Sequence, residues 1–241
     1  MQRLTHVSAL GKVLSCTRPQ ASQLLDEGLI VQISGGAGTV AGRTRKAVDH
    51  REIERFLAAL HHDARPVADV PAGLVPISKA AEKAKCPSVD IVHLILGGFL
   101  ENVARHGAEV GYAAILVDPD EVRNQMAAVM IGLSATDVFR RLRISRNTGW
   151  SLVLGNDEPR LRPTIIEGRN GRHEIYRFEE EAIAAFATEF TTAARLATEH
   201  NLQVGIVISQ LKRSGIRPAM PRRYFGLDFY RTSQIPEIRA A

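Results

Sequence analysis

Hydrophobic residues along this chain fall into short helical stripes that come in pairs. The clearest stripe lies within residues 204–211, where Val204, Val207, Ile208 and Leu211 have the i, i+3, i+4, i+7 spacing of one helix face. Each pair of stripes is followed by an apolar step, and a further capped helix begins about 17 to 21 residues after that step. The steps are Gly28-Leu29-Ile30, Gly98-Phe99-Leu100, Pro159-Arg160-Leu161 and Gly215-Ile216. The later helices are expected to open at Asp49, Asp118, Glu179 and Thr232.

This order of signals predicts a mainly α fold with small β-hairpin wings, built as four tandem winged helix-turn-helix units. The expected units are residues 1–65, 66–130, 131–190 and 191–241. Units of this length are near the lower limit for an independent core, so we expect them to pack on one another.

Capping residues mark several helix starts. Ser134 with Asp137 resembles a capping box, Ser145 is expected to cap the next helix, and Pro19 suits a first helical turn. Trp150 lies on an apolar stripe, which predicts core packing. Whether residues 179–200 form one continuous helix or two is left open by the pattern.

The four expected units differ in net charge, and these differences are more informative than the total. The net charge is +5, and the four expected units carry +3, −3, 0 and +5 in chain order. Arginine makes up 25 of the 31 basic residues, which favours bidentate contacts with phosphate or guanine. A polyanion is therefore expected at the ends of the chain, and the acidic unit 66–130 is a candidate for a structural role.

Composition also limits the other classes of function. No apolar run reaches the length of a membrane span, the two cysteines are isolated, and the N-terminus lacks a signal-like apolar stretch. We therefore expect a cytoplasmic protein with no membrane partner, no metal and no cofactor. The Gly36–Ala41 pattern resembles a dinucleotide-binding turn, but no helix is predicted to start there. No catalytic constellation is evident, so we expect no enzyme activity.

Polar residues at the start of the second helices are the candidates for contacts with bases and phosphates. These helix candidates are Thr17, Arg18, Gln20, Gln23, Ser145, Arg146, Asn147, Thr148, Gln203, Lys212 and Arg213. Cations in the stretches that follow are the candidates for phosphate contacts from the wings. These wing candidates are Arg43, Arg45, Lys46, Arg160, Arg162, Arg169, Arg172, Arg222 and Arg223.

Two segments resemble the MerR/excisionase type of winged helix. The likeness lies in the turn and second helix, in the variable basic wing, and in the later helices "VDHREIERFL" and "YRFEEEAIAAF", within residues 7–60 and 135–186. The resemblance implies that residues 17–25 and 145–153 enter the major groove and that residues 34–46 and 160–175 form wings. The series of units is also similar to the C-terminal part of TniQ-type target adaptors, whose cysteine-rich zinc portion has no counterpart here.

These observations favour a sequence-specific double-stranded DNA-binding protein, acting as an accessory factor in recombination or transposition of the excisionase or target-selection type. A transcriptional regulator is the alternative within this class. A scaffold that docks on a recombinase or transposase is the alternative from another class. The protein partners to consider are thus a recombinase, a transposase component or RNA polymerase.

Overall fold

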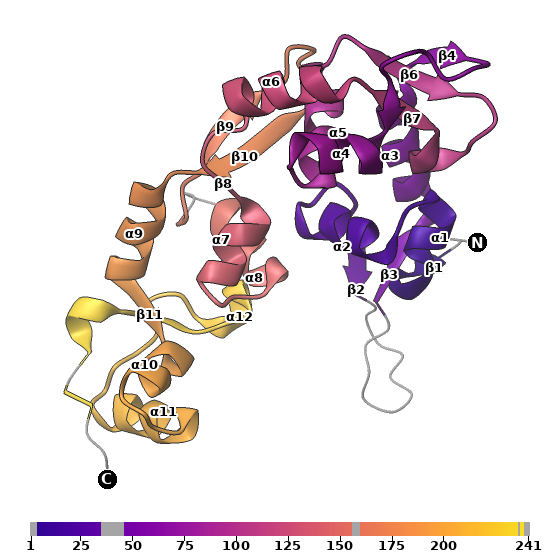
Figure 1. The fold of residues 1–241 in the computed structure, drawn as a ribbon. Helices are drawn as coiled ribbons and strands as arrows, with labels where there is room; N and C mark the ends of the chain where they lie inside the picture. Colours follow the sequence, from indigo (N-terminus) through magenta and orange to yellow (C-terminus); the bar gives the residue numbers. More distant parts are fainter. Residues whose placement is uncertain (1–3, 35–45, 156–159, 236, 239–241) are drawn as a thin grey trace. The chain divides into compact units, whose positions relative to one another are not determined.

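The computed structural model describes residues 4–34, 46–155, 160–235 and 237–238, and these residues form helices and small sheets (Figure 1). The chain divides into two compact units. Unit 1 holds residues 1–131 and 165–177, and unit 2 holds residues 132–164 and 178–241. The boundary expected between the first and second segments, near residue 65, falls inside unit 1. The boundary expected near residue 131 coincides with the end of residues 1–131, the longer of the two stretches of unit 1.

The segment 1–65 contains a short strand, two helices, a hairpin and a third helix. The three strands form an antiparallel sheet in the order β1-β3-β2, with Thr5 opposite Val48 and Val48 opposite Gln32. Asp49 caps the third helix by accepting a hydrogen bond from the Arg51 amide, as expected from the sequence. The elements are β1 (Leu4–His6), η1 (Val7–Ala9), α1 (Leu10–Leu14), α2 (Arg18–Asp26), β2 (Gln32–Ser34), β3 (Lys46–Asp49) and α3 (His50–His61).

The segment 66–130 repeats this order around a sheet with one additional strand. Strand β7 lies between β6 and β5, both antiparallel to it, and β4 adds to β6 in parallel. Asp118 caps the last helix, also as expected. The elements are β4 (Arg65–Val67), β5 (Val75–Pro76), α4 (Ile77–Ala84), α5 (Ser88–Leu96), β6 (Val103–His106), η2 (Gly111–Ala114), β7 (Ile115–Val117) and α6 (Pro119–Val129).

The segment 131–190 has the same order, with strands arranged β8-β10-β9. Ser134 and Ser145 cap its first two helices, and Trp150 is half-buried with its ring edge-on to Phe139. Residues 165–177 of its hairpin belong to unit 1. The elements are β8 (Leu133–Ser134), α7 (Ala135–Arg141), α8 (Arg146–Val153), β9 (Thr164–Glu167), β10 (Glu174–Phe178) and α9 (Glu180–Glu189).

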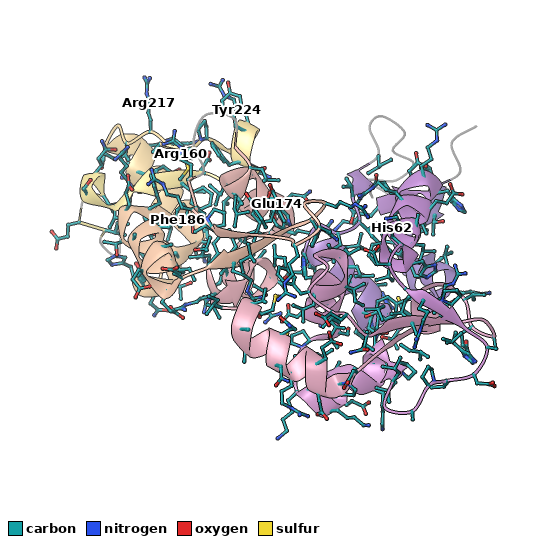
Figure 2. The ribbon with its side chains drawn as sticks, turned by 90° about the horizontal axis from the view of Figure 1, so that it is seen from above. His62, Arg160, Glu174, Phe186, Arg217 and Tyr224 are labelled. Carbon is teal, nitrogen blue, oxygen red and sulfur yellow. The ribbon has the colours of Figure 1, made fainter. Side chains whose placement is uncertain are left out.

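The final segment begins with a strand that interrupts residues 179–200, so this stretch is two helices rather than one. Strand β11 pairs antiparallel with β12, and Met220 forms an isolated bridge to Phe229. Phe186, labelled in Figure 2, packs within unit 2 against Phe190 and Phe229. The elements are β11 (Phe190–Thr192), α10 (Ala193–Glu199), α11 (Val204–Arg213), α12 (Arg222–Phe225), β12 (Phe229–Arg231) and η3 (Thr232–Gln234).

The turn between the first and second helix is the same in all four segments. The turn residue is Ser15, Lys85, Arg143 or Asn201, and its φ lies between 53° and 56° in each case. In each turn the next residue donates its amide to a carbonyl five positions earlier, as in a Schellman motif. These bonds are Cys16 to Gly11, Cys86 to Ala81, Ile144 to Phe139 and Leu202 to Ala197, at 2.8–3.1 Å.

The second helix ends on a left-handed glycine in three of the four segments. Gly28, Gly98 and Gly215 have φ of 75°, 68° and 71°, and the following amide bonds back to Leu24, Leu94 or Leu211. Glycine suits these positions because it adopts a positive φ without a Cβ penalty. These three glycines belong to the apolar steps that the sequence analysis identified.

Unit 1 has one continuous hydrophobic core rather than separate cores for its two sequence segments. The core includes Leu24 of α2, Phe56 of α3, Ile91 of α5 and Ile175 of β10. Helix α5 contacts both α2 and α3. The packing of small segments on one another, which their length suggested, is therefore present between residues 1–65 and 66–130.

A buried polar cluster lies within this core. The Nδ1 atom of His93 is 2.9 Å from Nε2 of His173, and the Nε2 atom of His93 is 4.0 Å from a Glu27 carboxylate oxygen. Arg177 lies 3.5 Å from Asp90 and donates to the carbonyl of Ile131 at 3.2 Å. These groups come from α2, α5 and the hairpin, so the cluster joins three stretches that are distant in sequence.

Both imidazoles of this cluster stay neutral at physiological pH. Burial, together with the nearby His173 and Arg177, lowers the pKa of His93 to about 3. Burial also lowers the pKa of His173 to about 4, against the opposing effect of Glu174. A pair of facing ring nitrogens can share one proton in a hydrogen bond but cannot accept a second charge without repulsion.

The first prediction concerns the left-handed turn residue. We expect Lys85→Gly to raise the free energy of unfolding by about 0.5–1 kcal/mol, because a glycine removes the Cβ strain of an exposed left-handed residue. Lys83→Gly, two residues earlier within α4, is the matched control and is expected to lower stability, since glycine is a poor helix former. Urea unfolding measures both, and a loss of stability on Lys85→Gly would contradict the assigned turn geometry.

The second prediction concerns the buried imidazoles. Because their folded pKa values lie below about 6.5, the unfolded chain binds more protons, and stability falls as the pH drops from 6.5 towards 4. The loss for each imidazole at pH 5 is about 2 kcal/mol. Hydrogen exchange of α5 peptides at pH 5 and 7.5, corrected for the intrinsic rate, measures this effect.

The control distinguishes this cluster from general acid denaturation. His93→Gln is expected to weaken the pH dependence, and His173→Gln is expected to do the same from the hairpin side. His200→Gln changes an exposed histidine and is expected to keep the wild-type dependence. An unchanged pH dependence in both cluster variants would show that the imidazoles do not limit stability in acid.

Candidate nucleic-acid interface

Because all four segments share the left-handed turn residue, equivalent positions of the four second helices can be found by counting from it. The position eight residues after the turn is occupied by Gln23, His93, Ser151 and Ser209 in α2, α5, α8 and α11. Six positions after the turn, the residues Ala21, Ile91, Gly149 and Val207 are all buried. The inner faces of the helices are therefore equivalent, and the outer faces can be compared directly.

Helix α2 exposes its first turn but turns its middle towards α5. Gln20 accepts hydrogen bonds from the amide and hydroxyl of Thr17, which completes a capping box, while Arg18 is exposed. Gln23 accepts a hydrogen bond from Ser88 at 3.4 Å. The Gln23 side chain is thus bonded within unit 1, which argues against the contact with bases that the sequence predicted for it.

A groove of about 500 Å³ runs beside the start of α2 within unit 1. Thr17 and Gln20 line it together with Lys12, Glu109 and Tyr112. The carboxylate of Glu109 opposes a phosphate at this place, since like charges repel. The groove therefore weakens the case for Thr17 and Gln20 as DNA contacts.

Helix α5 is enclosed along nearly its whole length. All residues from Ser88 to Ile95 are buried, and the position equivalent to an outward-facing side chain is His93 of the polar cluster. A helix without an exposed face cannot contact base edges. The structural role suggested by the acidic charge of residues 66–130 agrees with this burial.

Helix α8 is partly covered by α12 within unit 2. Gly226, directly after α12, lies so close to Thr148 that an added Cβ would be 3.1 Å from its hydroxyl oxygen. Thr148 is 3% exposed and bonds to Ser145, so the DNA contact expected for Thr148 is not accessible. Asn147 is exposed and Arg146 is half-buried, which leaves a short accessible turn at the start of α8.

Helix α11 is the second helix with the most open outer face among the described residues. Gln203, Val204, Gly205 and Ser209 are exposed, and the Gln203 side chain makes no capping bond. Its buried residues, Val207 and Leu211, pack in a small core with α10 and β12. The equivalents of Ser209 are Gln23, His93 and Ser151, none of which is fully exposed.

Exposed cations gather after this open helix. Lys212 and Arg213 end α11, and Arg217, Arg222 and Arg223 follow, all of them exposed. None of the five has a carboxylate within ion-pair distance among the described residues. Other exposed arginines of unit 2 are paired, as in the 3.0 Å contact of Arg231 with Glu189. Figure 2 shows Arg217 and Tyr224 extending outward from the same edge of this unit.

The wing candidates separate into three groups. Arg43 and Arg45 lie outside the described residues, and Lys46 is exposed at the start of β3. Arg160 and Arg162 are exposed in unit 2. Arg169 and Arg172 belong to unit 1, where the Arg169 guanidinium lies 5.5 Å from the Phe99 ring centre and the Arg172 amide bonds to Asn170. The hairpin and the helix of segment 131–190 are therefore divided between the two compact units.

Sequence patterns did not identify Val204, Ser209 and Arg217 as interface residues. Val204 was assigned to the apolar stripe of its helix, yet it is 43% exposed. One signal was available, because no Asp, Glu, Lys or Arg occurs between residues 200 and 211. Such a stretch suits contacts with uncharged base edges, and the cations that follow it suit contacts with phosphates.

The remaining chemistry of the described residues gives no alternative site. They contain no group of three or more potential metal ligands among His, Cys, Asp and Glu. Burial raises the pKa of the Cys16 and Cys86 thiols to about 11, so both stay protonated and pack in their turns. None of the described helices is long and apolar enough to cross a membrane.

The chain was compared with family models, curated proteins and solved structures, and it matches none of them.

Proposed function

We propose that this chain is a double-stranded DNA-binding protein whose four segments are winged helix-turn-helix modules. In this proposal α11 enters the major groove and the cations that follow it bind the flanking phosphates. The single observation that carries the proposal is the open face of α11, which carries no charge before Lys212, next to five exposed cations without a carboxylate partner among the described residues. The MerR/excisionase resemblance of the chain supports the same class of module.

Shape and charge agree with this assignment. An α-helix with its side chains is 10–12 Å across, which fits the major groove at about 12 Å. Unit 2 holds 14 Lys and Arg against 10 Asp and Glu, whereas unit 1 holds 17 against 16. The electrostatic attraction to DNA is therefore stronger in unit 2.

Arg160, Arg162, Arg222 and Arg223 are the proposed phosphate contacts outside α11. Arg222 donates its backbone amide to Asp228, which fixes the start of α12 while its side chain stays exposed. Arg223 lies with its guanidinium 4.6 Å from the Tyr224 ring centre, which orders that side chain. Arg18 and Asn147 remain secondary candidates, because the helices that carry them are more covered.

The biological role that we propose is an accessory factor in recombination or transposition, of the excisionase or target-selection type. A transcriptional regulator is the second candidate within the same class. Both rest on the resemblance of the modules.

A protein-docking role is the second candidate function, and the burial in unit 1 favours it for that unit. Its second helices, α2 and α5, pack against each other, and its basic and acidic residues nearly balance. We propose that unit 1 serves as a scaffold that docks on a recombinase or transposase component while unit 2 binds DNA.

Substitution of the α11 cations tests the DNA-binding proposal. Lys212→Ala with Arg213→Ala is expected to weaken binding to duplex DNA at least about tenfold at 0.1 M salt, because two phosphate contacts are lost. The slope of log affinity against log salt is expected to become shallower by about 2. Fluorescence anisotropy with a labelled duplex measures both quantities.

The matched control removes two exposed arginines of unit 2 that are paired with carboxylates. Arg140→Ala with Arg195→Ala changes the net charge equally, but these side chains contact Asp137 and Glu199. We expect a smaller loss of affinity in this control. Equal losses in the two double variants would indicate diffuse attraction, and absence of salt-sensitive duplex binding by the wild-type chain would overturn the proposed function.

A further inference from the structure

The first turn of α11 carries an exposed apolar side chain where the other segments carry polar ones. Val204 lies three positions after the left-handed turn residue, and its equivalents are Arg18, Ser88 and Arg146. Val204 is 43% exposed, although the core of its segment takes up Val207 and Leu211. A β-branched residue at a helix start contributes little to helix stability, so its exposure here is not explained by local folding.

The helix surface next to Val204 carries no charged side chain, and the next residue, Gly205, has no side chain. A Cβ added at Gly205 would meet no atom within 4 Å, so this side of the helix is open to close approach. Gln203 and Ser209, also exposed, offer an amide and a hydroxyl. The cations that have no carboxylate partner in the described part of the chain begin at Lys212, at the other end of the same helix.

These features match the chemistry of a thymine in the major groove. Its C5-methyl group is an apolar feature at the base edge, and aliphatic side chains recognise it by direct contact. The cations favour a polyanion as the occupant of this face, and the charge-free helix surface favours base edges over further phosphates. An exposed aliphatic side chain gains free energy by burying a methyl group.

We infer that Val204 contacts the methyl group of a thymine in the DNA site and so sets base preference at that position. This inference rests on the proposed function and deepens it by naming one recognised base. Gln203, directly before Val204, is exposed and available to a neighbouring base edge. The site selected by the protein therefore contains a thymine whose methyl group raises affinity.

The test replaces thymines one at a time by deoxyuridine in a duplex selected by the protein, which removes the methyl group and keeps the base-pairing edge. We expect one substitution to weaken wild-type binding about fourfold, the effect of losing one methyl-sized contact. Val204→Ala is expected to bind the thymine and the deoxyuridine duplex equally. Val110→Ala, at a position of unit 1 that is 69% exposed, is the control and is expected to keep the wild-type difference.

The outcomes separate this inference from the function on which it rests. Salt-sensitive duplex binding with no methyl-dependent thymine, or with a Val204→Ala variant that keeps the full difference, overturns the thymine contact and leaves DNA binding intact. Absence of salt-sensitive duplex binding by the wild-type chain overturns both.

Discussion

The left-handed residue between the paired helices is the constraint on which the rest of the structure depends. In each segment the next amide bonds to a carbonyl five positions earlier, and the second helix begins three residues after the left-handed residue. Three of the four segments then end that helix on a left-handed glycine. The backbone geometry that joins the paired helices is therefore the same local motif in each segment.

Because the motif is the same four times, the function of each copy depends on what covers its second helix. In unit 1, α2 and α5 cover each other and enclose a polar cluster that also holds the hairpin. In unit 2, α12 covers part of α8, while α11 keeps an open outer face. The same turn between paired helices therefore precedes a buried structural helix in one segment and a candidate DNA-contacting helix in another.

Charge and burial support the same division between the units. The buried carboxylates and Arg177 of unit 1 offset one another, and burial keeps both imidazoles of the cluster neutral. Such a network stabilises one arrangement of three chain segments, since each buried polar group needs its partner. In unit 2 the cations at and after the end of α11 are exposed and have no carboxylate partner among the described residues, which favours binding of an external anion.

The sequence predicted the local structure well because local structure follows from local signals. Asp49, Asp118, Ser134 and Ser145 act as helix caps, and three of the four apolar steps contain the terminating glycine, all from interactions within a few residues. Accessibility is a tertiary property, and the sequence did not predict it. Nothing near Gln23 or Thr148 indicates that Ser88 or α12 will cover them, and nothing near Arg169 indicates that its hairpin joins unit 1. The exposure of Val204 was missed because its spacing also fits an apolar face.

Photo-crosslinking from three exposed positions tests most directly which second helix contacts DNA. A cysteine carrying a crosslinker would replace Ser22 in α2, Asn147 in α8 or Ser209 in α11, in a chain whose two native cysteines are changed to alanine. We predict that position 209 gives the highest yield of duplex adduct, with positions 22 and 147 well below it. Strong adducts from position 22 or 147 with little from position 209 would contradict the assignment of α11.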